Sequence, residues 1–370
     1  MKFTIKRDDL LSPLQLVAGA VERRQTMPIL ANLLFVIADD TLSITGTDLE
    51  VEIVVRLAPE STTGVADNIT LPAKKLVDIC RSLPSGATIE FAMDNDQRMI
   101  VKSGRSRFTL STLPANDFPV TDVSEGDTSF TCAQGLIKRL VDRTSFAMAQ
   151  QDVRYYLNGL LWELENNQLR CVATDGHRLA MCTCELDIQV PVKRQLILPR
   201  KGVVELSRLL GSDESPIKVI LGSHHMRLET KEYTLTSKLV DGKFPDYQRV
   251  LPEGGHNILV GNREELKQTF ARTAILSNEK YRGVRLTLTD GLLTVVANNP
   301  EQEEAEEEVS VDYSGDKIEI GFNVSYLQDI TNVLDSDSIK MTLSDANSSA
   351  LLENPESGGD AAYVVMPMRL

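Results

Sequence analysis

The sequence predicts an α+β fold of three repeated domains, in which each domain packs two helices on antiparallel sheets. The first observation is an internal repeat: Phe130 and Asp175 bound a stretch that copies the one between Phe3 and Asp48, displaced by 127 residues at both ends. A fainter third copy begins near Ile258. The second observation is that each copy reads as strand, helix and strands, twice over. Repeats this long are whole domains, since solenoid units run about 20 to 50 residues.

Six helices are expected where apolar residues recur on one face of a helical period. Two prolines, Pro72 and Pro199, suit a first helical turn because proline loses no needed hydrogen bond there. Asn323 is expected to cap the last helix. The predicted helices cover residues 8–24, 73–82, 134–143, 199–208, 263–272 and 324–334.

Strands are expected where apolar residues alternate or β-branched residues cluster. The clearest are 49–57, 88–93, 217–221, 226–230, 233–237 and 339–343. Polar pairs at 39–40, 166–167 and 290–291 occupy matching hairpin positions in the three copies. Polar, glycine-rich stretches at 124–127 and 252–255 mark the boundaries, which gives domains at 1–127, 128–255 and 256–370.

The net charge of −14 argues at first sight against a nucleic-acid partner. The six predicted helices, however, carry a formal charge of +5, so the rest of the chain carries −19. This separation favours a helix surface that meets an anionic polymer. The alternative is that Lys and Arg are simply good helix formers.

Several features point to a cytoplasmic protein with no membrane segment. No run of about 18 apolar residues occurs, and the first residues form an alternating strand instead of a signal peptide. The five cysteines lie within apolar patterns, as expected for reduced structural thiols.

No catalytic or metal site is predicted, and no cofactor. Asp175 and His177 look catalytic, but the other two copies lack the histidine and no nucleophile accompanies them. Neither the Cys182 and Cys184 pair nor the His224 and His225 pair has the second pair that a structural zinc site needs.

The acidic run 301–308 has three interpretations. It could be a solvated face, or part of a two-metal nuclease site, although such a site needs carboxylates from separate elements. It could also complement the basic stretch that contains Arg105 and Arg107. One end of the chain would then be positive and the other negative, as a head-to-tail contact that closes a ring requires.

The best candidates for contact with DNA combine cations with aromatic rings, which can meet a backbone or an exposed base. Contact without base readout is expected. These residues are Arg23, Arg24, Lys74, Lys75, Arg200 and Lys201, together with a loop tip formed by Gln151, Arg154, Tyr155 and Tyr156. The apolar C-terminus predicts a final strand at 363–365, followed by Met366, Pro367 and Met368, which suit an adaptable peptide-binding surface.

Long motifs at 110–114, 151–159, 173–179, 237–247, 274–280, 298–305 and 363–370 resemble those of the bacterial sliding clamps, the beta subunits of replicative DNA polymerases. The resemblance spans the whole chain. It implies a head-to-tail homodimer that forms a six-domain ring, with helices lining the hole. Such a ring would encircle double-stranded DNA topologically and independently of sequence, in the nucleoid, and would tether DNA polymerase subunits. The clamp loader and other clients with a peptide motif would also be partners.

The resemblance also implies site residues. The client-binding pocket would contain Leu157, Thr174, Gly176, His177, Arg178, Leu179, Pro245, Arg249, Val250, Asn323, Tyr326, Ser349, Val364, Val365, Met366, Pro367 and Met368. The dimer seam would place Phe108 and Leu110 against Ile275 and Leu276, with Arg105 and Arg107 near Glu301, Glu303 and Glu304. Two positions, Asn347 and Tyr281, depart from the family pattern. The runner-up function is a metal-dependent DNA-processing hydrolase that uses the acidic run.

Overall fold

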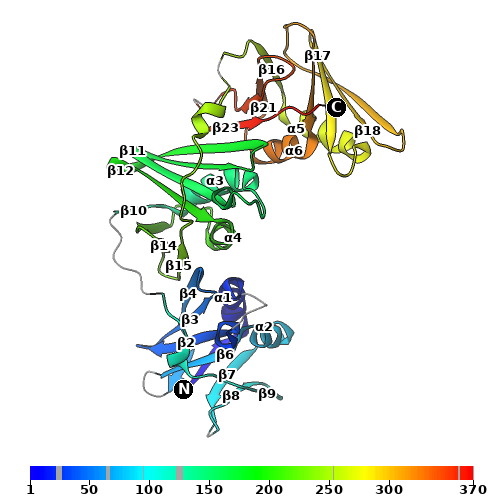
Figure 1. Ribbon diagram of the computed structural model, residues 1–370. Coiled ribbons are helices and arrows are strands. Elements are labelled where there is room, and N and C mark those ends of the chain that lie inside the picture. Colours follow the sequence, from blue (N-terminus) through cyan, green and yellow to red (C-terminus); the bar gives the residue numbers. More distant parts are fainter. Residues whose placement is uncertain are drawn as a thin grey trace. The chain divides into compact units, whose positions relative to one another are not determined.

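The computed structural model describes residues 1–21, 27–63, 67–94, 96–121, 128–252, 254–356 and 359–369. Arg23, Arg24, the boundary stretch 124–127 and residue 253 of the second boundary stretch lie outside these ranges. The chain forms two compact units (Figure 1). Unit 1 comprises Met1–Ile137 and Lys201–Leu239, and unit 2 comprises Lys138–Arg200 and Val240–Leu370.

Unit 1 holds the first repeat and both the beginning and the end of the second. Its helices α1 and α2 pack against each other, and α1 also packs on β3 and β4. The elements of the first repeat are β1 (Lys2–Lys6), α1 (Arg7–Ala20), β2 (Asn32–Ala38), β3 (Thr41–Thr47), β4 (Val51–Leu57), β5 (Ser61–Thr63), β6 (Asp67–Pro72), α2 (Ala73–Ser82), β7 (Thr88–Met93), β8 (Met99–Ser103) and β9 (Ser106–Leu110). From the second repeat come β10 (Thr128–Ala133), α4 (Arg200–Leu209), β13 (Pro216–Leu221), β14 (His225–Glu229) and β15 (Tyr233–Lys238).

Unit 2 holds the middle of the second repeat and the third repeat. Helix α3 (Gln134–Thr144) begins in unit 1 and lies mostly in unit 2, where the long strands β11 (Gly159–Thr174) and β12 (Arg178–Pro199) follow. The third repeat comprises β16 (Asn257–Asn262), α5 (Arg263–Thr273), β17 (Gly283–Thr289), β18 (Leu292–Asn298), β19 (Glu304–Ser310), β20 (Ile318–Asn323), α6 (Val324–Val333), β21 (Ser338–Leu343), β22 (Ala350–Glu353) and β23 (Ala361–Val365). Helices α5 and α6 pack against each other.

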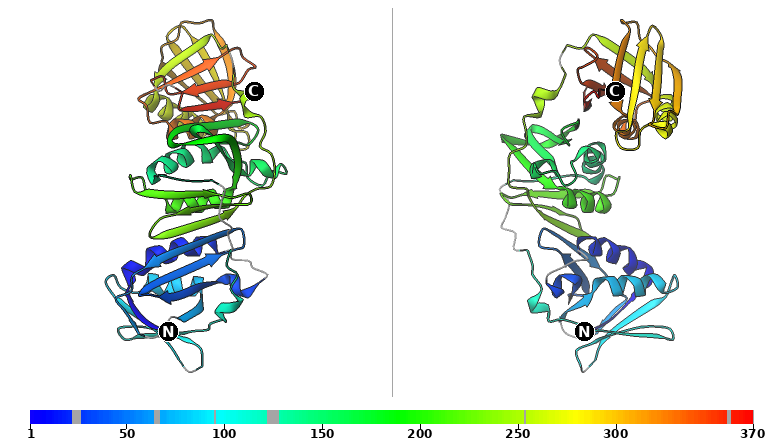
Figure 2. Two further views of the ribbon diagram at one scale, coloured as in Figure 1. Left: turned by 90° about the vertical axis from the view of Figure 1, so that its left-hand side faces the viewer. Right: turned by 45° about the vertical axis from the view of Figure 1, so that its right-hand side comes forward.

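Every strand pairing in the four sheets is antiparallel. Unit 1 has a five-stranded sheet of order β5-β1-β7-β8-β9 and an eight-stranded sheet of order β10-β13-β14-β15-β4-β3-β2-β6. Unit 2 has a six-stranded sheet of order β11-β12-β23-β22-β21-β16 and a four-stranded sheet of order β19-β18-β17-β20 (Figure 2). The large sheets therefore cross the boundaries between repeats, through β15 beside β4 and through β23 beside β12.

Local patterns explain the elements. In α2 the residues Ala73, Leu76, Val77 and Cys80 are buried on one face, and the helix has the bounds that its apolar spacing predicts. Strand β7 also has the predicted bounds, and its Phe91 stacks on Phe3 of β1 with ring centroids 4.5 Å apart.

Some details differ from the sequence expectations. Strand β4 begins at Val51 and not at residue 49, because the Asp48 carboxylate accepts hydrogen bonds from the Glu50 and Val51 amides, and Leu49 has a φ of 77°. Pro72 and Pro199 each end a strand one residue before the helix, and therefore lie outside the first turn.

The three hairpin predictions have different outcomes. Asp39 and Asp40 both have positive φ between β2 and β3, as a tight hairpin turn requires, and Gly291 has a φ of 70° between β17 and β18. The pair at 166–167 lies inside β11, where Asn166 has a φ of 55° and the register against β12 shifts. The asparagine cap on α6 is confirmed, since the Asn323 side chain accepts a hydrogen bond from the Ser325 amide at 2.9 Å. Within the described residues, no helix is long and apolar enough to cross a membrane.

Candidate functional site

A mainly apolar pocket of about 600 Å³ lies in unit 2. Strands β11, β12 and β23 form its floor, and the segment 245–252 and the loop 344–349 form its walls. The floor is rigid because Leu157, Leu179 and Val364 belong to a buried cluster in the core of the unit. A concave apolar site with a few polar groups at its rim is suited to binding a small ligand or a short peptide.

Most residues assigned to the pocket by resemblance do line it. They are Leu157, Thr174, Gly176, Arg178, Leu179, Pro245, Arg249, Val250, Ser349, Val364 and Met366. The sequence analysis missed several other lining residues, namely Asp246, Tyr247, Leu251, Pro252, Ser344 and Ser348, and it had assigned Arg154 only to DNA. The one available signal was the adjacency of 246–252 and 344–348 in sequence to assigned residues.

The remaining assigned residues lie outside the lining of the pocket. The His177 carbonyl accepts a hydrogen bond from the Met366 amide at 2.9 Å, and Val365 is fully buried where it pairs with Arg178. Asn323 caps α6, as described above. Met368 lines a second cavity of about 520 Å³ on the four-stranded sheet. Pro367 lies between Met366 and Met368 in sequence and lines neither cavity.

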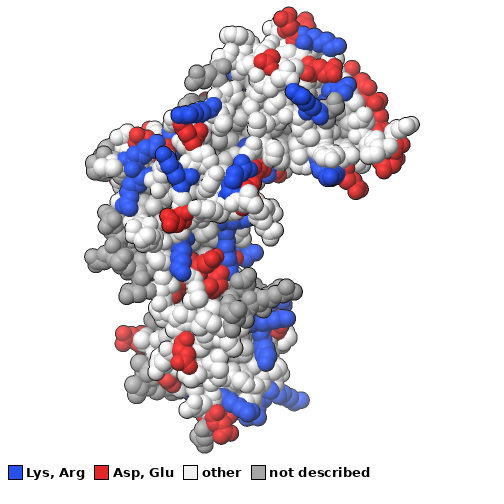
Figure 3. Space-filling view, viewed as in Figure 1, with Lys and Arg blue, Asp and Glu red and all other residues white. Residues whose placement is uncertain are grey.

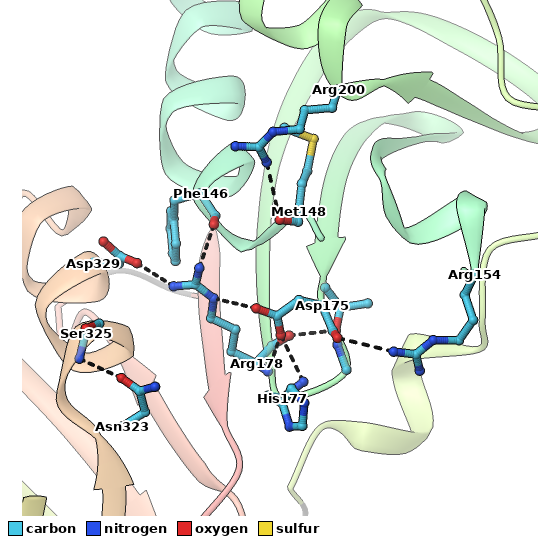
Figure 4. A network of polar contacts seen from close by, with 12 residues as sticks. Phe146, Met148, Arg154, Asp175, His177, Arg178, Arg200, Asn323, Ser325 and Asp329 are labelled. Carbon is cyan, nitrogen blue, oxygen red and sulfur yellow. Dashed lines mark hydrogen bonds and ion pairs between the residues drawn. The ribbon is translucent and has the colours of Figure 1, made fainter. Parts of the chain in front are cut away.

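Arg178 lies at the centre of a polar network in the pocket wall (Figure 4). Its guanidinium donates to Asp175 at 3.0 Å, to the Phe146 carbonyl at 2.8 Å and to Asp329 of α6. It also lies 4.4 Å from the ring centroid of Tyr326, and burial raises the pKa of that tyrosine. Three of the five N–H groups of the guanidinium are used in this network, so Arg178 helps to shape the wall of the pocket.

The residues predicted to contact DNA differ in accessibility. Lys74 and Lys75 lie on the exposed face of α2 in unit 1. Gln151, Arg154 and Tyr155 are exposed at a loop tip of unit 2, where the rings of Tyr155 and Tyr156 meet edge-on at 5.8 Å.

Three of these cations are engaged within their own units. Arg154 forms a bidentate ion pair with Asp152 at 2.9 and 3.0 Å. The Lys201 ammonium donates to the Ala20 carbonyl at 3.0 Å and pairs with Asp48. The Arg200 guanidinium donates to the Met148 carbonyl at 3.3 Å. Internal contacts of this kind leave fewer donors for phosphate.

The residues predicted for the seam lie on two sheet edges. Strand β9 is the last strand of the five-stranded sheet and exposes Arg107, while Arg105 is exposed in the turn before it. Strand β19 is an edge of the four-stranded sheet, and Glu301, Glu303 and Glu304 are exposed along and just before it. Figure 3 shows acidic side chains gathered on the side of unit 2 where Figure 1 labels β18.

The apolar seam residues also differ from one another. Ile275 is 75% exposed beside this acidic edge, whereas Leu276 and Phe108 are half-buried. Leu110 is only 6% exposed within unit 1 itself, because it pairs with Met99 inside the sheet. It therefore offers little surface to a partner.

Comparison with known proteins covers the whole chain. Residues 1–122, 131–246 and 248–369 match the N-terminal, central and C-terminal domains of the DNA polymerase III beta subunit. The chain belongs to the DNA polymerase III beta subunit family. Beta sliding clamps of Pseudomonas aeruginosa and Escherichia coli K12 are 58% and 52% identical to it, and each match covers 100% of both chains.

A solved structure supports the same family assignment. The P. aeruginosa sliding clamp bound to griselimycin has a TM-score of 0.96 and 58% identity, with all of both chains covered. Members of this family are non-catalytic processivity subunits of DNA polymerase III. The protein is therefore a processivity subunit and not an enzyme.

Family membership sets aside the alternative of a metal-dependent hydrolase. The acidic run has a different structural context in β19, where Glu307 forms a bidentate ion pair with Arg272 of α5 at 2.5 and 2.6 Å. In the part of the chain that the structure describes, no group of three or more His, Cys, Asp or Glu residues is arranged to hold a metal.

Proposed function

We propose that two copies of this sliding clamp join head to tail in a closed ring around duplex DNA, where the ring tethers polymerases and other clients through the pocket of unit 2. The observation that carries this proposal is the equivalence of the strand pairings. In unit 1 the last strand of the second repeat, β15, pairs with β4 of the first repeat. In unit 2 the last strand of the third repeat, β23, pairs with the start of β12, and Arg178 there lies 127 residues after Val51 of β4.

In this pattern of pairing between neighbouring repeats, two strands keep one unpaired edge each. The last strand of the first repeat, β9, and the strand that corresponds to β4 in the third repeat, β19, are both sheet edges. Unpaired edges are normally protected or used for pairing with another chain. Pairing β9 of one copy with β19 of a second copy would repeat the pairing that already joins neighbouring repeats, and two such contacts close a ring.

Charge supports this pairing. Arg105 and Arg107 would face the acidic edge that contains Glu301, Glu303 and Glu304. Ile275, exposed beside that edge, would supply apolar surface to the seam together with Leu276 and Phe108. Complementary charge favours this orientation and opposes contact between two like edges.

Binding to DNA would be topological and independent of sequence. Exposed cations such as Lys74, Lys75 and Arg154 would meet the phosphate backbone, and Tyr155 would meet the sugar or an unpaired base. A chain with a net charge of −14 cannot hold DNA by attraction alone, so enclosure has to supply retention.

The pocket would bind short extended peptides from clients, including DNA polymerase subunits and the clamp loader. Its apolar floor suits one or two large apolar side chains, and griselimycin, bound in the P. aeruginosa clamp structure, is a candidate ligand. The three repeats, at 1–127, 128–255 and 256–370, would act as the domains of a protein that works at the nucleoid in the cytoplasm.

Two measurements test the ring. Multi-angle light scattering should give the mass of a dimer. After loading by a clamp loader, the protein should co-purify with nicked circular DNA and dissociate when the circle is linearised. A monomeric mass, or retention of the protein on the linearised DNA, would overturn the proposal.

A further inference from the structure

A buried polar cluster lies behind one wall of the pocket. Its centre is Glu163 of β11, whose side chain is 1% exposed. One carboxylate oxygen, Oε1, accepts hydrogen bonds from the Tyr247 hydroxyl at 2.7 Å and from Arg170 Nη1 at 2.9 Å. The other oxygen, Oε2, accepts from Gln195 Nε2 at 2.6 Å and pairs with Lys193 Nζ at 2.9 Å.

The cluster remains charged at neutral pH. Burial alone would raise the pKa of Glu163, but hydrogen bonds from Lys193, Tyr247 and Gln195 outweigh burial and hold the pKa below its ordinary value. Arg170 Nη1 also donates to the Tyr247 hydroxyl oxygen at 3.0 Å. The hydroxyl therefore donates to an anion and accepts from a cation, which fixes its position in two directions.

Tyr247 connects this cluster to the pocket. Its ring is buried in the same core cluster as Leu157, Leu179 and Val364, and it lines the pocket. It is also the first residue of a short 3₁₀ turn, Tyr247–Val250. The segment 245–252 contributes Pro245, Asp246, Tyr247, Arg249, Val250, Leu251 and Pro252 to the lining, more than any other continuous stretch.

This wall belongs to no strand, so it lacks the hydrogen-bond ladder that holds the floor. The other polar contacts described for the segment are internal: the Leu251 amide donates to Gln248, and Arg249 pairs with Asp246. Besides the apolar packing of Phe244, the Tyr247 ring and Leu251, the polar anchor of this wall on the sheet is thus the Tyr247 hydroxyl.

We propose that Glu163 and Arg170 are positioning residues for the client pocket, because they lock Tyr247 and thereby hold the wall 245–252 in the shape that a client peptide meets. This inference rests on the proposed peptide-binding function. Preorganisation of this kind strengthens binding by reducing the ordering that the peptide has to impose on the wall. Neither residue lines the pocket or needs to touch the peptide.

The two oxygens of Glu163 allow the positioning role to be separated from a purely structural one. The bonds of Oε2 to Lys193 and Gln195 connect β11 and β12, whereas those of Oε1 reach Tyr247 and Arg170. Tyr247→Phe deletes the hydroxyl but keeps the ring. Lys193→Met removes a cation from the same carboxylate on the other side. Tyr313→Phe is a second control, because the Tyr313 hydroxyl is hydrogen-bonded to Asn257 and to the Asp316 carbonyl and lines neither described cavity.

The experiment measures binding of a fluorescein-labelled peptide with leucine and phenylalanine at its centre to the full-length dimer. Tyr247→Phe and Glu163→Gln should each weaken peptide binding about 5- to 20-fold. The double variant should bind the peptide with nearly the same affinity as either single variant, because both changes break the same hydrogen bond. Lys193→Met removes one donor from Oε2 and leaves both bonds of Oε1, so it should weaken binding less than Tyr247→Phe does. Tyr313→Phe should bind within about twofold of the parent protein. Amide hydrogen exchange should accelerate in 245–252 for Tyr247→Phe but not for Tyr313→Phe.

Emission from Trp162, the single tryptophan, checks that β11 is intact in every variant. If Tyr247→Phe binds the peptide as tightly as the parent, or if it weakens binding without faster exchange in 245–252, the positioning role is wrong. If the parent protein itself binds no peptide, the proposed pocket function fails instead.

Discussion

Arg178 and Asp329 form an ion pair that joins β12 to α6 across 151 positions of the chain. The guanidinium is 12% exposed, and its other nitrogens donate to Asp175 and to the Phe146 carbonyl. One side chain thus holds the second and third repeats together beside the pocket. This bonding predicts that Arg178 acts first on the stability of unit 2 and only through it on peptide binding.

Arg178→Ala should lower the stability of unit 2 by about 2 to 4 kcal/mol, because it removes the donor to Asp329 and to the Phe146 carbonyl and one of the three donors to Asp175. Differential scanning calorimetry would measure this change as a lower temperature of the unfolding transition. Arg249→Ala is the matched control, since Arg249 is 84% exposed and its loss should change stability by no more than about 0.5 kcal/mol. Equal transition temperatures for both variants would show that the network adds nothing.

Truncation of both Ile275 and Leu276 to alanine should give folded monomers. If the seam buries them, each truncation costs up to about 2 to 5 kcal/mol of association energy. Sedimentation velocity at submicromolar protein would report the mass. Val153→Ala, at a still more exposed site on a loop tip, should remain dimeric. A double variant that still sediments as a dimer would place the seam elsewhere.

Affinity for short linear duplex should be weak and should fall steeply with salt, because retention depends on enclosure and the cationic surface is thin. A clamp loaded on closed circular DNA should stay until the circle is cut. Gel-filtration of the loaded complex before and after cleavage tests this. Tight binding to an unblocked linear duplex at about 0.15 M salt would contradict it.

Deletion of residues 366–370 should abolish peptide binding and leave the dimer intact. Met366 lines the pocket, and its amide donates a hydrogen bond to the His177 carbonyl. The deletion therefore opens one wall of the pocket. Calorimetric titration with a client peptide and light scattering would be run on the same sample. Unchanged peptide affinity in the truncated dimer would remove the pocket from the proposed function.

Glu52→Gln should change the pH dependence of stability. Burial raises the pKa of Glu52 above its ordinary value, although the carboxylate accepts a hydrogen bond from the Thr121 amide at 3.0 Å. The folded state therefore binds this proton more tightly than the unfolded state, and stability falls as pH rises above about 4.3.

The Glu52→Gln variant should not show this fall in stability with rising pH. Its advantage over the parent should be greatest near neutral pH and should shrink as pH falls toward about 4.5, when melting temperatures are compared across a pH series. Glu50→Gln, at an exposed neighbouring site, provides the control. A constant difference between variant and parent would show that Glu52 titrates normally.

The sequence by itself determined the repeat and the α+β class, because these depend on patterns of apolar and polar residues that local physics enforces. The family followed from the resemblance of its long motifs. Helix α2 and strand β7 have the predicted bounds since their apolar spacing alone selects helix or strand. The Asn323 cap was predictable for the same reason, as a side chain needs only the amide two residues ahead.

Only the tertiary structure decided what the site residues touch. The sequence could not assign Lys201 to Asp48 or Tyr247 to Glu163, because each contact joins segments that lie far apart in the chain. It also could not show that Leu110 is 6% exposed within unit 1. The resemblance placed Arg178 in the pocket, and the fold shows in addition that its guanidinium donates to Asp175, Asp329 and the Phe146 carbonyl. A cation's residue type indicates that it can donate hydrogen bonds, but the acceptors within reach decide where those bonds go.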